Sequence, residues 1–131
     1  MDRVKSVLGD MELVYLTPSE SDNEMQMLYV NIQEVHLQIH YNTVNQFLHF
    51  RGKVFSCIPE QKRSLALAFL NERNNDLILK YYLDKKGDAC VEWFVDMEFA
   101  TVSDDGLSTA LTSVIKAAKE LMEPMMRVRF S

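Results

Sequence analysis

The stretch 77–122 constrains the fold more than any other part of this chain. Apolar residues alternate with other residues in 77–83 and again in 91–99, which predicts two strands, because side chains two residues apart share a face of a strand. The turn between them contains Gly87, and glycine readily takes the positive φ that a short hairpin loop needs. An apolar stripe with helical spacing begins at Leu107, so we expect a helix to cover one face of this hairpin.

The two faces of the second strand differ in chemistry. The side predicted to lie under the helix carries Val91, Trp93, Val95 and Met97. The opposite side carries Glu92, Phe94, Asp96 and Glu98. Carboxylates at alternate strand positions commonly face water, and the spacing of a calcium-binding loop is absent. We interpret this second side as a solvated face, and Phe94 makes it a candidate protein-binding surface.

The last helix has a recognisable start. Ser103 is predicted to be its N-cap, with Asp104 and Asp105 in the first turn, where the helix dipole favours acids. Pro124 is expected to stop or kink the helix, because proline lacks the N–H group that a helix interior uses. The basic and apolar tail 125–130 would then dock elsewhere.

The rest of the chain predicts further strands and two more helices. A short helix is expected within 1–10, a helix over 59–72, and strands over 11–17, 25–32, 35–41 and 44–55. The strand 25–32 is apolar on both sides, which favours a central position or cover on one face and a partner on the other. The helix 59–72 is apolar nearly all round, which predicts packing on more than one side.

Local signals mark the connections between these elements. Pro18 to Asn23 is predicted to be a surface loop, and Gly52 a bulge in its strand. Residues 42–43 form either a turn or the bend of one long strand. Asn74 and Asn75 tolerate left-handed φ and should end the helix before them. Strands and helices are segregated along the chain, so we expect an α+β fold with a largely antiparallel sheet, in one domain over 1–131.

Composition narrows the choice of partner and compartment. The net charge of −5 argues against a general nucleic-acid binder, whose affinity depends on neutralising phosphates. No apolar run approaches the roughly 18 residues of a membrane span, and no signal peptide is recognisable, so we expect a cytoplasmic protein without a membrane partner. Cys57 and Cys90 are too few for a disulfide framework, and we expect both to be reduced, with one partly buried.

No arrangement of residues indicates catalysis or a metal. His36 and His40 lie in a strand pattern, where four residues span about 13 Å, too far for the two to share an ion. His49 from another strand does not shorten that distance. The four glycines form no phosphate-binding loop, and neither cysteine has a nucleophile motif around it. We therefore expect a chain without enzymatic activity, catalytic residues, cofactor or metal.

The methionines allow two interpretations. Met122, Met125 and Met126 cluster near the end of the last helix. Methionine fills irregular gaps in cores and also lines adaptable protein-binding surfaces. Core filling is the first interpretation, and the second places these three residues at a contact between subunits.

The runs FLNERNNDLILKYYLDKKGDACVEWFVDM and VSDDGLSTALTSVIKAAKELM resemble the YbjN domain family, in which an Asn-rich turn, a hairpin with an Asp/Gly turn and a Ser-started helix follow one another. The clear match covers 65–122. The resemblance implies the fold of type III secretion chaperones, with helices packed on an antiparallel sheet, and a homodimer. The resemblance implies no catalytic residues. The family opens with a longer helix than residues 1–8 allow here.

Two functions follow from the resemblance. The first is a non-enzymatic regulator of bacterial sensory transduction that binds a protein partner as a dimer. The second is a secretion-type chaperone that holds an extended segment of an effector. An enzyme with an unrecognised site is a third and weaker alternative.

Overall fold

A five-stranded antiparallel sheet forms the centre of the computed structural model, which describes residues 1–18, 24–74, 78–98 and 101–131. The elements in chain order are α1 (Asp2–Asp10), β1 (Met25–Ile32), β2 (Val35–Asn42), β3 (Phe47–Val54), the 3₁₀ helix η1 (Glu60–Lys62), α2 (Arg63–Arg73), β4 (Lys80–Leu83), β5 (Ala89–Asp96) and α3 (Asp104–Arg129). The strand order in the sheet is β1-β2-β3-β5-β4. The predicted α+β fold with an antiparallel sheet is confirmed.

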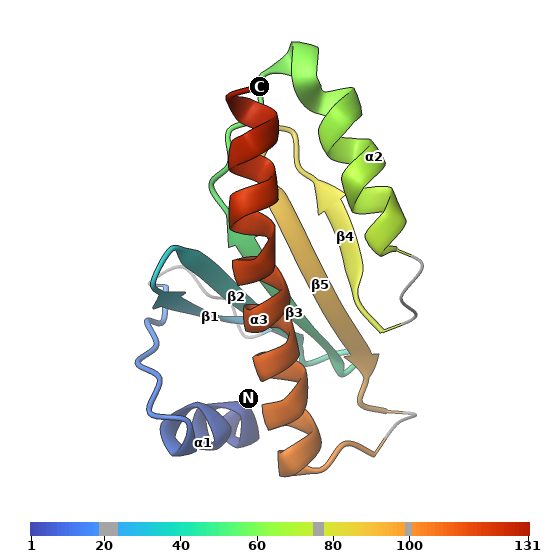
Figure 1. Ribbon diagram of the computed structural model, residues 1–131. Helices are drawn as coiled ribbons and strands as arrows, with labels where there is room; N and C mark the ends of the chain where they lie inside the picture. The colour runs from blue at the N-terminus through green and yellow to red at the C-terminus, as the bar shows by residue number, and fades with distance from the viewer. Residues whose placement is uncertain (19–23, 75–77, 99–100) are drawn as a thin grey trace.

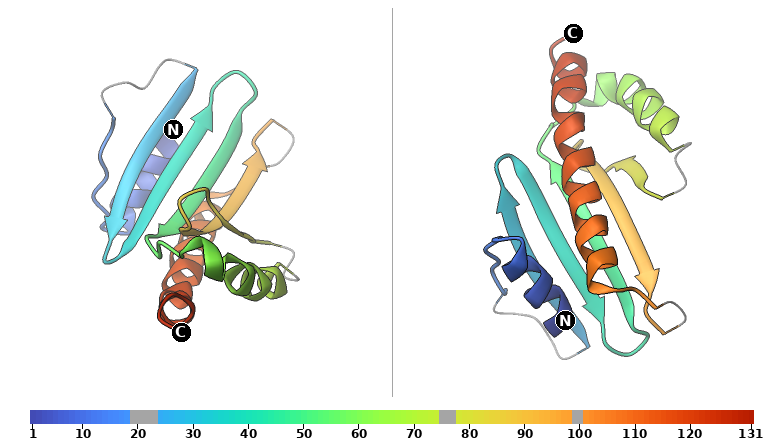
Figure 2. Two further views of the ribbon diagram at one scale, coloured as in Figure 1. Left: turned by 90° about the horizontal axis from the view of Figure 1, so that it is seen from above. Right: turned by 60° about the horizontal axis from the view of Figure 1, so that its bottom comes forward.

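The helices leave one face of the sheet open. The long α3 crosses the strands, and α1 lies beside the first half of α3 on the same side (Figures 1 and 2). The core lies between these helices and the sheet, around Leu37, Phe50, Leu111 and other fully buried side chains. Trp93 stacks on Phe50 at 5.0 Å between ring centroids and is partly buried against this core. The other face of the sheet is not covered by any helix in the described residues.

Helix α3 begins as predicted but does not end as predicted. The Ser103 hydroxyl accepts a hydrogen bond of 3.0 Å from the Gly106 N–H group, so Ser103 is the N-cap. The helix continues through Pro124 to Arg129, so the predicted stop and the separate tail are wrong. An internal proline costs about 3 kcal/mol. Met125 directly follows it and is fully buried, which stabilises the last turns by an amount of similar size, about 1.5–3 kcal/mol.

Gly52 lies in a regular part of β3, where it pairs with Leu37 and Val91, so the predicted bulge is wrong. The reason for glycine is the close approach of α3. A Cβ atom at this position would lie 3.0 Å from Val114 Cγ1 and 3.2 Å from Ala118 Cβ. The glycine therefore lets the helix and the sheet pack closely.

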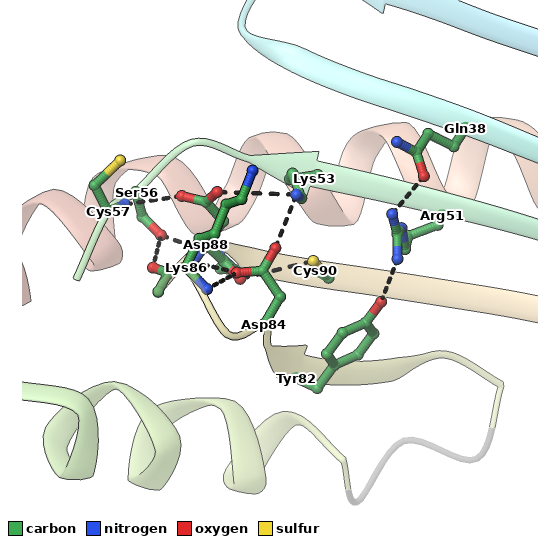
Figure 3. A network of polar contacts seen from close by, with 12 residues as sticks. Gln38, Arg51, Lys53, Ser56, Cys57, Tyr82, Asp84, Lys86, Asp88 and Cys90 are labelled. Atoms are coloured by element: carbon green, nitrogen blue, oxygen red, sulfur yellow. Dashed lines mark hydrogen bonds and ion pairs between the residues drawn. The ribbon is translucent and has the colours of Figure 1, made fainter. Parts of the chain in front are cut away.

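The β4–β5 turn confirms the predicted hairpin and is tied to the segment after β3. Gly87 has a φ of +84°, and a Cβ atom there would lie 2.5 Å from the carbonyl oxygen of Ile58. The Asp84 carboxylate accepts hydrogen bonds from the Lys86 and Asp88 N–H groups, at 2.9 and 3.0 Å (Figure 3). Ser56 Oγ donates to the Gly87 carbonyl and accepts from the Ala89 N–H group, each at 3.0 Å.

Helix α2 packs on one side only. Ala66 and Leu70 are buried, whereas Leu65 and Leu67 are 60% and 41% exposed, so the predicted packing on several sides is not present among the described residues. Asn74 ends the helix with a right-handed φ of −70°, not the predicted left-handed one. Its side chain instead bonds the backbone of Tyr81 in β4, accepting from the N–H group and donating to the carbonyl. The predicted part played by Asn75 lies outside the described residues.

The amino-terminal region departs from expectation in two places. Helix α1 buries Val4, Val7 and Leu8 as predicted. The segment 11–17 is not a strand, because only Leu16 forms an isolated bridge, to Tyr29. Strand β1 has the predicted bounds. It lies at the edge of the sheet, so the predicted central position is wrong, and the alternative prediction of a strand covered on one face is correct. The predicted loop 18–23 lies outside the described residues except for its first residue. Residue 77, at the start of the first predicted hairpin strand, and residue 99, at the end of the second, also lie outside them.

Candidate protein-binding surface

The candidate acidic face of β5 lies on the open side of the sheet. Cross-strand pairing places Glu92 opposite Arg51, and Phe94 opposite His49. Their neighbours in the strand point the other way, and Val91 is fully buried beneath α3. The predicted division of the two faces of β5 is therefore present in the structure. Asp96 and Glu98 follow at the end of the strand, where the Asp96 carboxylate accepts a hydrogen bond from the Glu98 N–H group.

Glu92 is engaged in a polar network on this face and is not a free acid. Its carboxylate lies 3.2 Å from His49 Nε2, and the Tyr82 hydroxyl also bonds to it. Burial alone would raise the pKa of Glu92, but the hydrogen bonds from His49 and Tyr82 hold that pKa below its usual value. Arg51 extends the network by donating to the Tyr82 hydroxyl and to the side-chain amide oxygen of Gln38 (Figure 3). These contacts hold the side chains in place, and the nearby His49 and Arg51 largely balance the negative charge of Glu92.

Phe94 is the exposed apolar residue of the face. Its side chain is 41% exposed and stacks on Phe47, which is 38% exposed, with 5.4 Å between ring centroids. Lys80 Nζ lies 4.7 Å from the centroid of the Phe94 ring, a cation–π contact. The pair Phe47 and Phe94 forms a rigid aromatic platform on an otherwise polar surface, and such aromatic side chains are enriched in protein interfaces.

The three candidate methionines belong to α3, on the covered side of the sheet, and are therefore separate from the face of β5. Met125 is fully buried, so it belongs to the core and not to an accessible surface. Met122 and Met126 instead line a groove of about 410 Å³ between the end of β3 and the second half of α3. Phe55, Glu34 and Arg129 contribute to the same groove.

The histidines do not form a metal site. His40 and His49 lie in neighbouring strands with ring centroids 5.7 Å apart. Burial, and then the nearby charge of His49, lower the pKa of His40. Within the residues that the structure describes, no three histidine, cysteine, aspartate or glutamate side chains are arranged to hold a metal ion.

Both cysteines are free thiols, as predicted. Cys57 is exposed and Cys90 is buried, and burial raises the pKa of Cys90 to about 11. A thiol with that pKa is protonated at neutral pH and is a poor nucleophile. Across the described ranges, no helix is long and apolar enough to cross a membrane.

Residues 1–125 match the family described as "YbjN: Putative bacterial sensory transduction regulator". The chain belongs to the YbjN family. The match extends well beyond the stretch 65–122 that carries the resemblance in the sequence, and includes α1 and the first three strands. A search of curated proteins finds no match to this YbjN chain.

Solved structures with a similar fold come from protein complexes. One is the Yersinia pestis type III secretion chaperone SycH in complex with a stable fragment of YscM2, with a TM-score of 0.59 and 15% identity over 92% of this chain and 97% of that chain. Another is the ExsC–ExsE complex, with a TM-score of 0.65 and 16% identity over 98% of this chain and 91% of that chain. The YbjN chain thus has the fold of a type III secretion chaperone, as the resemblance implied.

Sequence reasoning missed several residues of these surfaces. Phe47 and Arg51 come from β3, and their contacts with β5 depend on a strand register that the sequence does not reveal. The groove could have been found in part, because Met122, Met126 and Arg129 follow one another at helical spacing beside the buried stripe of α3.

Proposed function

We propose that this YbjN chain is a non-enzymatic protein-interaction domain, a cytoplasmic regulator of sensory transduction that acts as a homodimer and binds a protein partner. The observation that carries the proposal is the Phe47–Phe94 platform on the open face of the sheet. Burying two stacked aromatic rings is a typical energetic centre of an interface. Glu92, Asp96 and Glu98 would surround this centre as a polar rim.

The same face gives little support to catalysis. Glu92, a partly buried acid of the face, is already bound by His49 and Tyr82. Its lowered pKa favours a permanently charged group, whereas a general acid near neutral pH needs a raised pKa. Cys90 is buried and protonated. Support for a binding role also comes from the solved complexes of similar fold.

A secretion-type chaperone that holds an extended effector segment is the second candidate. The observation in its favour is that β1 is an edge strand of the described sheet, and that Leu16 forms an isolated bridge to Tyr29 on its outer side. An exposed strand edge can accept an extended peptide as an additional strand. SycH was itself solved in complex with a fragment of another protein.

Substitution of Phe94→Glu tests the proposal. We expect the amount of partner recovered with the tagged protein from its native cell to fall about tenfold, because loss of a central aromatic anchor commonly costs 2 kcal/mol or more. Val14→Glu is the matched control, since Val14 is exposed in the segment before β1, and β2 separates β1 from the strands of the platform. Thermal melts of both variants should show that folding is retained.

The identity of the recovered protein separates the two candidate functions. A folded partner supports the regulator, whereas one stoichiometric, unstructured client encoded beside this chain supports the chaperone. Equal recovery with Phe94→Glu and wild-type protein would contradict the platform as the binding centre.

A further inference from the structure

A second apolar groove follows the methionine groove along α3. It has a volume of about 300 Å³, and Leu13, Ile32 and Ile115 contribute apolar side chains to it. Ile32 ends β1, and Glu34 of the methionine groove lies two residues later in the β1–β2 turn. The two grooves therefore both border this turn.

The residues that α3 contributes to the two grooves are spaced by one, three or four positions, so they share one side of the helix. They run from Thr112 to Arg129, a length of about 26 Å at 1.5 Å per residue. We call this surface the α3 strip; it consists of Thr112, Ile115, Lys116, Lys119, Met122, Met126 and Arg129. The α3 strip is long enough to accommodate four to five turns of a partner helix.

The charge of the α3 strip is opposite to that of the whole chain. Lys116 and Lys119 form the rim of the second groove, and the structure shows no ion pair for either within its described ranges. Glu34 is the acid among the lining residues of the two grooves. The neighbouring Glu123 is paired with Arg127 at 3.6 Å. A chain with a net charge of −5 thus presents an apolar strip with a basic rim.

The neighbours of the α3 strip favour a helix over an extended segment as its occupant. The strip is bounded by the segment after α1, by the β1–β2 turn and by the end of β3, and its own backbone groups are engaged in α3. An extended peptide gains affinity from backbone hydrogen bonds to a strand edge, which this surface does not offer. A helix binds a groove through side chains alone, with apolar anchors at spacings of three and four.

We propose that the α3 strip binds an acidic amphipathic helix of a partner protein. The apolar side of that helix packs on Ile115, Met122 and Met126. Its carboxylates face Lys116, Lys119 and Arg129, which gives the interaction its charge selectivity. The inference rests on the proposed function, since it states the chemical class of a partner segment and where that segment binds.

The test begins with a phage-displayed library of random 18-residue peptides, selected on the intact chain at low salt. We expect the enriched peptides to contain more Asp and Glu than the starting library, with apolar residues at helical spacing. The best peptide is then synthesised, and its affinity for the chain is measured by fluorescence anisotropy. Raising the salt from 50 to 500 mM should weaken binding about tenfold, because salt screens exposed charges.

Two pairs of variants locate the binding site. Lys116→Glu combined with Lys119→Glu should weaken the peptide about tenfold or more by reversing the rim charge. Its control, Lys85→Glu combined with Lys86→Glu, makes the same charge change in the exposed β4–β5 turn and should leave affinity unchanged. Met126→Asp, at a residue that is 48% exposed, should weaken binding, whereas Val44→Asp should not. Circular dichroism checks that every variant is folded.

Each remaining outcome distinguishes the inference from the proposed function. Enriched peptides without an excess of acids, or binding that survives the lysine reversal, would overturn the inference. If Phe94→Glu abolishes peptide binding and the lysine reversal does not change it, the inference is overturned and the proposed function stands. A change of oligomeric state in the lysine variant would show that a second copy occupies the α3 strip, against the proposal. A library that yields no binding peptide would count against both.

Discussion

At the scale of single residues, Lys53 joins β3 to the β4–β5 turn. Its Nζ atom lies 2.8 Å from the Asp84 carboxylate and 3.9 Å from that of Asp88, and all three side chains are largely buried (Figure 3). Asp88 also accepts a hydrogen bond from the Cys57 N–H group at 3.0 Å. Because the groups are shielded from solvent, removal of one partner leaves another buried charge without compensation.

Asp84 should make folding stability depend on acid pH. Burial alone would raise the pKa of Asp84, but the ion pair with Lys53 and the backbone hydrogen bonds lower it below its usual value. A carboxyl group with a lowered pKa in the folded state stabilises the protein above its unfolded pKa of about 3.9, and that stability is lost as the pH falls through the folded pKa. Glu92 has a lowered pKa too and should contribute in the same direction.

Asp84→Asn tests this dependence. We expect the free energy of unfolding at pH 7 to fall by about 1–3 kcal/mol, since a charged hydrogen-bond partner of Lys53 is removed. The difference between variant and wild type should shrink towards pH 3, as measured by urea unfolding. Glu123→Gln, in an exposed pair with Arg127, is the control and should change stability by less than about 1 kcal/mol. A pH-independent difference would contradict the assignment.

At the scale of elements, the contact between α3 and the sheet depends on Gly52. The Cβ position of Gly52 is crowded by Val114 and Ala118, which face β3 from consecutive turns of α3. Small residues on both elements bring helix and strand close, so the fold tolerates little added volume here.

Gly52→Val should destabilise the fold by about 1–3 kcal/mol, because the added methyl groups force α3 away from β3. Gly9→Val is the matched control, since a Cβ atom at Gly9 has no neighbour within 4 Å. We expect that control to change stability by less than about 0.5 kcal/mol. Urea unfolding of both variants provides the measurement, and an equal effect at the two positions would show that the close contact does not limit packing.

At the scale of the whole molecule, the apolar surface of α2 offers a place for a second copy. Leu65 and Leu67 are exposed, and Leu65, Phe69, Pro124 and Val128 line an apolar groove of about 330 Å³ between α2 and the end of α3. Exposed apolar patches of this kind mark contact sites. An interface through α2 would give this helix the cover on a second side that its sequence predicts.

Leu65→Glu should therefore convert a dimer into a monomer. Sedimentation at micromolar concentration should show a dimer for the wild-type chain and a monomer for the variant, because the charge would be buried at the contact. Val14→Glu, at an exposed residue before β1, is the control and should remain dimeric. A wild-type chain that sediments only as a monomer would contradict the dimer.

A structural feature could be predicted from the sequence when the interactions that produce it lie within a few residues along the chain. Ser103 starts α3, and Gly87 shapes the β4–β5 turn, because each acts on backbone groups within a few residues. The solvent-facing side of β5 was also predictable, because alternation is a property of the strand itself. Gly52 and Pro124 were misjudged, because their surroundings are supplied by distant segments.

The sequence by itself determined most of the strand and helix segments, though not 11–17 or the end of α3, and it determined where α3 begins and which face of β5 meets solvent. These features arise from side-chain periodicity and local hydrogen bonds. Only the tertiary structure decided that Phe94 stacks on Phe47, that Met125 is core while Met126 is surface, and that Lys116 and Lys119 border the same apolar strip. Those contacts depend on strand register and on the path of α3 across the sheet, which are settled by how the whole core packs.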